Sequence, residues 1–460
     1  MDATLVLGPP DAWAAATFGT AALGDPRRTA RLVRTAAAIA RQPAASLPAR
    51  LADPAALKAT SRLLGNDAIG FEAILAPHTS QTRAAATAGV VLLVQDTTDV
   101  DFSTHRAVTG LGPIGNGGGR GLFLQTMLAV RPDERCPLGV LAATPFVRTP
   151  APAGETRHAR AHRARESDIW GTMATQVGPP PAGTRWVHVA DRGADCFTFF
   201  TAVQATGADV LVRVTQNRRV ILPDGTSGHL IDGLRATPPA MTRPLAVPAQ
   251  ATQPARATAV AVAWTALTLA PPTTRRRDQP APPPLPVWGV RVWEPAPPPG
   301  VVPVEWLLLT SVPVVTVADA WERVAWYTAR WLIEELHKGL KTGCRLEQVQ
   351  LRTRAGLERL LALLLPVAVR LLQLRALSRQ HPYAPATQLV AGATVRLVAA
   401  LTGQPAADTV AQLAAQIARL GGYQDRHGDG PPGWQTLWRG WQQLETAQAT
   451  LTALGLDRPP

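Results

Sequence analysis

The run Val90-Val91-Leu92-Leu93-Val94, followed by Gln95-Asp96-Thr97-Thr98, decides the expected fold of this chain. Five consecutive apolar residues are typical of a strand that is covered on both faces. We expect this strand to end at the polar residues, and a second apolar run, 186–190, to end in the same way at Asp191. In a parallel or mixed sheet, carboxylates at such strand ends can converge on one crevice.

The rest of the central region also follows an α/β pattern. Further strands are expected at residues 122–130, 138–144, 210–214 and 305–310, with an exposed, arginine-rich helical piece around 157–173. Residues 222–304 are dense in proline and contain short runs rich in Val and Trp, which predicts a β-rich insertion. The predicted fold class is therefore α/β, with a mixed sheet.

Helical patterns flank this region on both sides. Asp25 as an N-cap and Pro26 as the first helical residue predict the start of one helix. A second helix is expected over 54–64. At the other end, helices are expected over 354–379, 384–403 and 406–420. The spacing of Trp434, Trp438 and Trp441 indicates one more helix, whose tryptophan stripe is either core or a partner-helix face.

Charge and composition narrow the class of partner. The 460 residues are 46% hydrophobic, and 46 basic against 33 acidic residues give a net charge of +13, which favours a polyanionic partner. The best apolar run, 360–369, is too short to cross a membrane and is expected to be a buried helix. The absence of a secretory signal and three widely separated cysteines favour a reducing cytoplasm and no membrane partner.

A third acid is expected on a long helix that begins near Thr316, with Asp319 as its capping-box partner, and ends at Gly343. Four polar side chains recur along that helix within about 60° of arc, given 100° per residue. One face therefore presents a phenol, a guanidinium, a carboxylate and an ammonium. The four residues are Tyr327, Arg330, Glu334 and Lys341.

Two aspartates and a glutamate in a basic protein indicate a hard-cation site for Mg²⁺, with Mn²⁺ as a substitute. Two such ions, roughly 4 Å apart, would promote an in-line phosphoryl transfer, and Arg330 with Lys341 would hold the phosphodiester. The alternative is that Arg330 and Glu334 form an ordinary surface pair and that the aspartates are turn residues. Glu334 and His337 also have the spacing of a di-iron ligand pair, an alternative to which we give little weight.

The segment from Tyr327 to Lys341 resembles the Y-(2)-R-(3)-E-(6)-K signature of the IS-four family of cut-and-paste DDE transposases. The resemblance extends over nearly the whole chain. Asp96-Thr97-Thr98 is similar to the family's first aspartate motif, and Asp191-Arg192-Gly193-Ala194-Asp195 to its D-R-E-A-D motif, with Gly193 in place of Glu. Further similar segments are residues 21–33, 306–311, 367–375, 417–422 and 437–441.

This resemblance implies an RNase H-like catalytic core over residues 71–375, with residues 222–304 as its β-rich insertion. It also implies a helical domain at 1–70 that binds transposon ends and a helical dimerisation domain at 376–460. Asp96, Asp191 and Glu334 would be the catalytic residues and the ligands of two Mg²⁺ ions. The partners would be double-stranded DNA, as terminal inverted repeats and target, and a second copy of the chain in a synaptic dimer, acting in the bacterial cytoplasm at the nucleoid.

Other residues have implied roles in DNA contact. Trp306 corresponds to a family position that stacks a flipped base, and its alternative is a core indole at a strand start. Arg213 corresponds to a DNA-contacting arginine, and its alternative is a plain surface charge. The stripe of Arg27, Arg28, Arg31 and Arg34 is expected to bind DNA, with a solvated face as its alternative. The full expected set for phosphate and DNA is Tyr327, Arg330, Lys338, Lys341, Arg213, Arg27, Arg28 and Arg31.

Three functions therefore remain open on the sequence alone. The first is a DNA transposase that nicks transposon ends, forms and reopens a hairpin, and joins the 3′ end to target DNA. The second is a catalytically impaired protein of the same fold that binds transposon ends or inhibits transposition, an interpretation favoured by Gly193. The third is a nuclease of the same fold that hydrolyses DNA without strand transfer.

Overall fold

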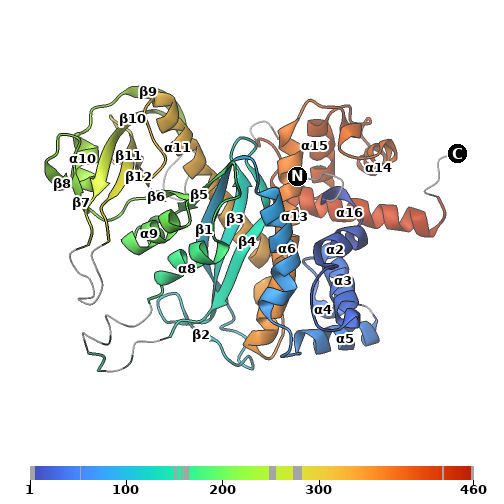
Figure 1. Cartoon of the computed structure of the whole chain (residues 1–460). Helices are drawn as coiled ribbons and strands as arrows, with labels where there is room; N and C mark the ends of the chain where they lie inside the picture. The colour runs from blue at the N-terminus through green and yellow to red at the C-terminus, as the bar shows by residue number, and fades with distance from the viewer. Residues whose placement is uncertain are drawn as a thin grey trace.

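A twelve-stranded mixed sheet forms the centre of the computed structural model, which describes residues 6–51, 53–149, 152, 154–156, 159, 165–247, 255–272, 282–426 and 429–456 (Figure 1). The strand order is β2-β3-β1-β5-β6-β12-β11-β10-β7-β8, with β4 paired to β3 and β9 to β10. The strands are β1 (Gly89–Asp101), β2 (Gly112–Ile114), β3 (Gly119–Arg131), β4 (Cys136–Phe146), β5 (Thr184–Ala190), β6 (Asp209–Arg213), β7 (Arg219–Ile221), β8 (Ser227–His229), β9 (Met241–Val247), β10 (Arg256–Leu269), β11 (Leu285–Trp293) and β12 (Glu305–Thr310).

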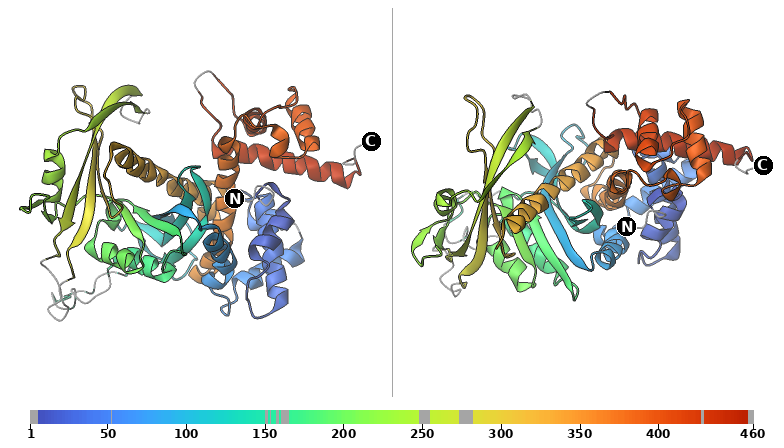
Figure 2. Two further views of the ribbon diagram at one scale, coloured as in Figure 1. Left: turned by 45° about the horizontal axis from the view of Figure 1, so that its top comes forward. Right: turned by 90° about the horizontal axis from the view of Figure 1, so that it is seen from above.

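Helices cover the sheet and form a separate mass beside it (Figures 1 and 2). The strands β1, β5 and β6 are parallel to one another, and the other described pairs are antiparallel. This arrangement confirms the predicted mixed-sheet α/β fold and is consistent with an RNase H-like core. The helices are α2 (Pro10–Phe18), α3 (Pro26–Arg41), α4 (Leu47–Arg50), α5 (Pro54–Leu64), α6 (Phe71–Ala85), α8 (Asp168–Val177), α9 (Phe197–Ala205), α10 (Leu230–Ala236), α11 (Val317–Ala329), α12 (Trp331–Lys338), α13 (Arg354–Gln380), α14 (Gly392–Thr402), α15 (Val410–Leu420) and α16 (Trp434–Ala453).

Strand β1 is buried on both faces, as its apolar run predicts. Leu92 and Val94 belong to the cluster that also contains residues of α11, α12 and α13. Val91 and Leu93 point to the other face and pack with residues of α8 and α9. Alternation along a strand places successive side chains on opposite faces, so Asp96 shares the face of Leu92 and Val94.

The predicted end of this strand is wrong, because β1 continues through the polar residues to Asp101. Its antiparallel partner β3 is equally long and pairs residue by residue with it, Asp96 lying opposite Thr126. The continuous ladder keeps the polar stretch extended. On the other side, the parallel pairing with β5 ends at Val94 and Val189, so Asp96 and Asp191 both lie two residues beyond the last pair.

The segment 222–304 is β-rich, as predicted, and its strands β8 to β11 extend the central sheet. Helix α10 lies within it. Of the arginine-rich piece expected around 157–173, residues 157, 158 and 160–164 lie outside the described residues, and α8 begins at Asp168. Within the described residues of that range, α8 covers 168–173.

The predicted long helix is interrupted. Its start is confirmed, since Thr316 and Asp319 form a capping box at α11. The helix is broken at Arg330, whose N–H bonds to the carbonyl of Tyr327 three residues back. Helix α12 follows and passes into a π-helical turn over 339–343, closed by Cys344 N–H on the carbonyl of Gly339. The uniform helical spacing that the sequence suggests does not continue to Lys341.

Helix α13 is the central helix of the molecule and carries three buried arginines, Arg359, Arg370 and Arg375, of which the first two bind backbone carbonyls of the N-terminal segment. Arg359 donates to the carbonyls of Ile69 and Leu64 at 2.6 and 2.8 Å, and Arg370 donates to the carbonyl of Val6 at 2.9 Å. These bonds satisfy backbone groups that burial would otherwise leave unpaired. The helix is long and apolar enough to cross a membrane, but 94% of its most apolar window is buried inside the protein, as the sequence predicts for residues 360–369.

The C-terminal helices pack against α13 and resolve one open alternative. Trp434, Trp438 and Trp441 of α16 are each no more than 5% exposed and belong to the main core. The tryptophan stripe is therefore core, and the partner-helix interpretation is wrong. The helix expected over 384–403 begins only at Gly392, because residues 386–388 form a separate 3₁₀ turn.

Candidate active site

Asp96 and Asp191 lie close enough to repel each other. Asp96 projects from the middle of β1, with 18% of its side chain exposed, and Asp191 follows the last residue of β5. Burial, and next the charge of Asp191, raise the pKa of Asp96 to about 6, and the charge of Glu334 acts in the same direction. The structure thus brings the three predicted acids into one electrostatic neighbourhood.

Arg330 lies between two of these acids. One guanidinium nitrogen lies 3.5 Å from Asp96 Oδ2, and another donates to Glu334 Oε1. The guanidinium also faces the ring of Tyr327, 5.9 Å from its centroid. The expected i,i+4 pair between Arg330 and Glu334 is therefore present, but it is joined to Asp96 on the sheet and is more than a surface pair.

A second group of cations and aromatic rings adjoins these acids. Arg213, at the end of β6, is half-buried and donates to the carbonyl of Glu305 at 3.2 Å. Burial, and next the charge of Arg192, lower the pKa of Arg213. Trp306 is also half-buried, and its ring centroid lies 5.4 Å from that of Tyr327, edge on. Arg213 is therefore no plain surface charge.

The two lysines of the long helical segment have different surroundings. Lys341 Nζ lies 3.0 Å from Asp99 Oδ1 and 3.8 Å from Glu347 Oε1, so it is paired with a second acidic group beyond the three acids. Lys338 is exposed on α12, one turn after Glu334. The structure thus places Lys341 away from the Arg330 contacts, although both were expected on one helix face.

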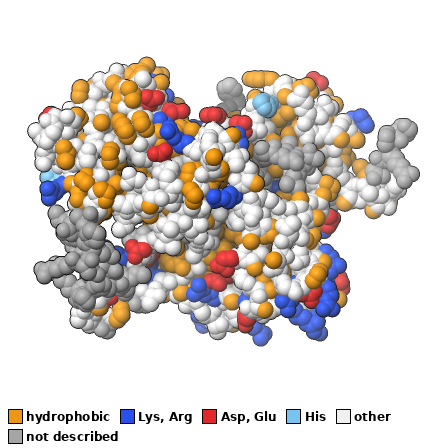
Figure 3. Space-filling view, viewed as in Figure 1, with side chains coloured by type: hydrophobic (Ala, Val, Ile, Leu, Met, Phe, Trp, Pro, Cys, Tyr) orange, Lys and Arg blue, Asp and Glu red, His pale blue; other side chains and the backbone are white. Residues whose placement is uncertain are grey.

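The predicted basic stripe lies on α3, in the helical mass beside the sheet. Arg27 is 92% exposed and pairs with Asp25 at 3.0 Å, while Arg28 donates to the carbonyl of Leu23. Arg31 is half-buried and Arg34 is exposed. Figure 3 shows basic side chains gathered over the region of α3 to α5, to which Lys58 and Arg62 of α5 also contribute exposed charge.

The glycine that departs from the D-R-E-A-D pattern is packed against Asp191. Gly193 N–H donates to Asp191 Oδ1 at 2.8 Å. A Cβ at this position would lie 3.0 Å from the same oxygen and 3.3 Å from the ring of Trp170. A larger residue here would therefore contact both Asp191 and Trp170, and these neighbours would have to shift by a few tenths of an ångström.

Three site features were not expected from the sequence. Arg192 adds an exposed charge near Arg213, and only its place directly after Asp191 could have indicated this. Asp195, in the same motif, is buried and accepts the N–H groups of Thr215 and Gln216, so it holds the loop after β6. His337 is buried, with Nε2 3.4 Å from Thr126 Oγ1, and burial lowers its pKa to about 3.

The three acids have the chemistry of a hard-cation site, with Arg330 as their present counter-charge. Carboxylate oxygens are the ligands that Mg²⁺ prefers, and the raised pKa of Asp96 shows that added positive charge would stabilise its ionised form. In the described part of the chain, no three His, Cys, Asp or Glu side chains stand at ligating distance from one point. Binding of an ion would therefore require the carboxylates to turn from Arg330 towards one another.

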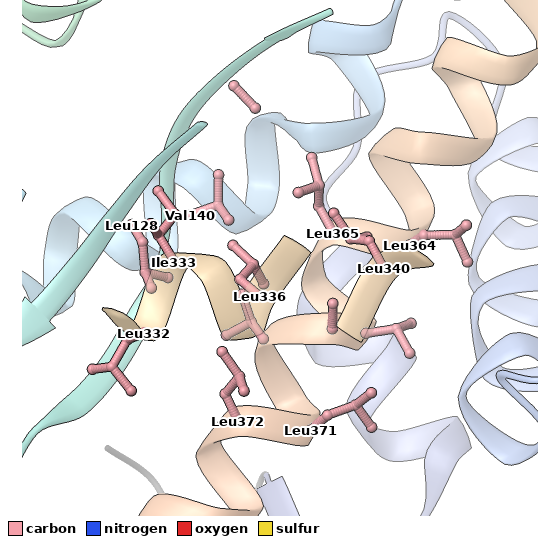
Figure 4. Packing of buried hydrophobic residues seen from close by; sticks show 14 of the residues in the cluster. Leu128, Val140, Leu332, Ile333, Leu336, Leu340, Leu364, Leu365, Leu371 and Leu372 are labelled. Atoms are coloured by element: carbon pink, nitrogen blue, oxygen red, sulfur yellow. The ribbon is translucent and has the colours of Figure 1, made fainter. Parts of the chain in front are cut away.

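Helix α12 holds Glu334 at this position. Figure 4 shows Leu332, Ile333 and Leu336 on the buried side of α12, towards the sheet residues Leu128 and Val140 and towards α13. Glu334 lies on the opposite side of the helix, with 46% of its side chain exposed. The apolar side of α12 thus fixes which way the carboxylate points.

Comparisons with known proteins match two transposase family models to the chain. A family model described as transposase DNA-binding matches residues 10–69, and one described as transposase DDE domain matches residues 100–369. The second match contains Asp191 and Glu334 and begins four residues after Asp96. Domains of this kind normally use divalent metal ions.

The chain is similar to, among others, a piggyBac transposase synaptic complex with hairpin DNA, a solved structure determined by cryo-electron microscopy. The identity is 8% and the TM-score 0.34, over 84% of this chain and 61% of the other. The chain thus spans about three fifths of the length of that protein. Because the DDE domain model matches more than half of the present sequence, the chain belongs to the transposase DDE domain family.

Proposed function

We propose that the chain is a cut-and-paste DNA transposase of the IS-four family, most similar within it to the transposase of transposon five. The reaction would be phosphoryl transfer at transposon ends: nicking, formation and resolution of a hairpin, and joining of the 3′ end to target DNA. The observation that carries the proposal is the contact of Asp96 and Glu334 with Arg330, with the charge of Asp191 acting on Asp96 and the cations Arg192 and Arg213 beside them.

The residues of this site divide into acids and phosphate-binding groups. Asp96, Asp191 and Glu334 would hold two Mg²⁺ ions, with Mn²⁺ as a substitute, and these ions would polarise the attacking and leaving oxygens. Arg330 would exchange its contact with Asp96 for a phosphate oxygen, which its planar guanidinium can bind through two donors. Arg213, Tyr327, Lys338 and Lys341 would line the DNA backbone, and Trp306 would stack an extruded base.

The proposed division of the chain follows its helical and mixed-sheet parts. Residues 1–70 would bind transposon ends, 71–375 would catalyse, with 222–304 as the insertion, and 376–460 would dimerise. The match of 10–69 to a transposase DNA-binding model supports the first of these roles. Double-stranded DNA and a second copy of the chain would be the partners, in the bacterial cytoplasm at the nucleoid.

The test is Glu334→Gln, assayed on an oligonucleotide that carries the inverted repeats flanking the gene. We expect end nicking in Mg²⁺ to fall by at least about 10³-fold, since a ligand of the ions contributes several kcal/mol to transition-state stabilisation. Glu322→Gln is the matched control, because Glu322 is an exposed glutamate on the preceding helix, paired with Arg323. Nicking that persists in Glu334→Gln would contradict the assignment.

A second candidate is a catalytically impaired protein that binds transposon ends. The observation that favours it is Gly193, which stands where the family's motif has a glutamate and is packed closely against Asp191 and Trp170. Cleavage of the same oligonucleotide by the unmodified chain, dependent on Mg²⁺, would eliminate this candidate. Analysis of the products for joined 3′ ends separates a transposase from a nuclease of the same fold.

A further inference from the structure

A group of buried polar side chains crosses the sheet directly behind Asp96. Gln95 of β1, Gln125 of β3 and His188 of β5 are each 0% exposed. They lie on the face of the sheet opposite to Asp96, among the apolar residues that pack with α8 and α9, and His188 contacts the ring of Phe199. Burying such groups is costly unless they are hydrogen-bonded.

Their hydrogen bonds form one continuous series, in which each residue donates to the next. The hydroxyl of Thr97 donates to Gln125 Oε1, Gln125 Nε2 donates to Gln95 Oε1 at 3.4 Å, and Gln95 Nε2 donates to His188 Nδ1 at 2.8 Å. Burial lowers the pKa of His188 to about 3, so its ring is neutral and can accept at Nδ1. This series of hydrogen bonds therefore links the three central strands β3, β1 and β5.

Thr97 connects this series of hydrogen bonds to the carboxylate of Asp96. Thr97 N–H donates to Asp96 Oδ1 at 2.9 Å, while the hydroxyl of the same residue is fixed by Gln125. Thr97 thus connects the hydrogen-bonded residues on one face of β1 with the acid on the other. A shift or rotation of β1 at this level would move the carboxylate of Asp96 relative to Asp191.

We propose that Gln95, Gln125, His188 and Thr97 are positioning residues that orient Asp96 for cation binding. The inference deepens the proposed function and rests on the cation site assigned to Asp96. Apolar side chains of similar volume would satisfy the packing of this layer without any polar group to pair. The role of the hydrogen-bonded polar side chains is therefore geometric. They fix the lateral position of β1 at the level where the two aspartates leave the sheet.

The first test compares Thr97→Val with Thr97→Ser by calorimetric titration of Mn²⁺ into the full chain without DNA. Thr97→Val keeps the shape of the residue but removes the donor to Gln125, and we expect the Kd for Mn²⁺ to rise by up to about 10-fold. Thr97→Ser retains a hydroxyl and is expected to bind as the unmodified chain does. Equal affinity of the valine and serine variants would overturn the inference.

The second test removes the buried groups together, as Gln95→Leu/Gln125→Leu/His188→Leu. Because the three buried groups are removed together and only the half-buried hydroxyl of Thr97 loses its acceptor, we expect a melting temperature without metal no lower than that of the unmodified chain, but weakened Mn²⁺ binding. The matched control is Thr35→Val/Thr60→Val, which removes a buried hydroxyl pair, 2.9 Å apart, between α3 and α5. That control is expected to leave Mn²⁺ affinity unchanged.

Asp96→Asn distinguishes a failure of the proposed cation site from a failure of the proposed positioning role. If the unmodified chain shows no Mn²⁺ binding that Asp96→Asn removes, the proposed cation site fails and this inference with it. If binding depends on Asp96 but the triple leucine variant binds as tightly as the unmodified chain, the inference alone is overturned. If the triple variant does not fold, the comparison at Thr97 decides.

Discussion

Asp96 is held between burial, which favours its neutral form, and Arg330, which favours its charged form. Burial prevails, and the pKa near 6 leaves the group ionised at neutral pH at a cost to stability. A buried carboxylate that is ionised at neutral pH is expected in an empty cation site. The negative charge that lowers the stability of the folded protein is the same charge that would attract a cation.

This balance predicts how Asp96→Asn affects stability in a chelator. The folded pKa is raised, so protonation of Asp96 stabilises the native state below about pH 4, and this contribution is lost as the pH rises through 6. The asparagine variant should therefore be more stable than the unmodified chain at pH 8, by up to about 3 kcal/mol for two units of pKa. The advantage should shrink towards pH 4.5, as measured by thermal unfolding.

Asp319→Asn is the control of opposite sign. Hydrogen bonds from the N–H groups of Val315 and Thr316 lower the pKa of Asp319. Its asparagine variant should therefore be less stable than the unmodified chain at pH 8. A stability difference for Asp96→Asn that does not change between pH 8 and pH 4.5 would show that the carboxyl titrates normally in the folded chain.

The acids and the neighbouring cations differ in how well the sequence predicts them. Asp96 and Asp191 could be singled out because each follows an apolar strand, and Glu334 because it recurs with other polar residues along one helix face. The contact of Arg330 with Asp96 and the pairing of Lys341 with Asp99 could not, since both depend on how a helix lies against a strand distant in sequence. The buried chain from Thr97 to His188 was missed for the same reason.

Helix α12 is the element that determines where Glu334 lies. It is only eight residues long, and its ends are a tight turn at Arg330 and a π-helical turn at Gly339. So short a helix is unstable alone and takes its stability from packing. Its orientation therefore depends on the leucines and isoleucine of its buried side.

Leu336→Ala tests this dependence. Leu336 is 0% exposed and lies between the sheet and α13 (Figure 4), so truncation should lower the free energy of unfolding by about 3 kcal/mol. Urea denaturation measures the change. Leu401→Ala, at a leucine 43% exposed, should change stability by less than about 0.5 kcal/mol. Similar losses in both variants would show that α12 is not anchored through this side chain.

The elements themselves show where sequence reasoning holds. The helix at 54–64 and the capping box of Thr316 are confirmed, because local caps and periodicity specify them. The end of β1 was predicted five residues or more too early, because pairing with β3 maintains a polar strand that local propensity does not favour. The break at Arg330 likewise depends on tertiary contacts and leaves no mark in the residue spacing.

At the scale of the whole molecule, charge is unevenly distributed. The basic group on α3 and α5 lies in the helical mass, apart from the acids on the sheet (Figures 1 and 3). A polyanion that contacts both the basic group and the acids would span the helical mass and the sheet. Binding through released counterions depends steeply on salt concentration.

Arg31→Ala/Arg34→Ala should therefore reduce the salt dependence of DNA binding. If each arginine neutralises one phosphate, the slope of log K against log salt should become less steep by about 2. Fluorescence anisotropy with the end oligonucleotide at a series of salt concentrations measures it. Arg419→Ala, at an arginine paired with Asp425 on the C-terminal helices, should leave the slope unchanged. An unchanged slope in the double variant would assign α3 to a solvated face.

The buried arginines of α13 limit how the molecule can rearrange. Arg359 and Arg370 bind backbone carbonyls of the N-terminal segment, while the same helix packs against the sheet and α16. A swing of the N-terminal helices about a hinge would break the hydrogen bonds of both buried guanidinium groups to these carbonyls. We therefore expect these parts to approach a duplex as one rigid body, with any bending needed to reach both α3 and the central sheet supplied by the nucleic acid.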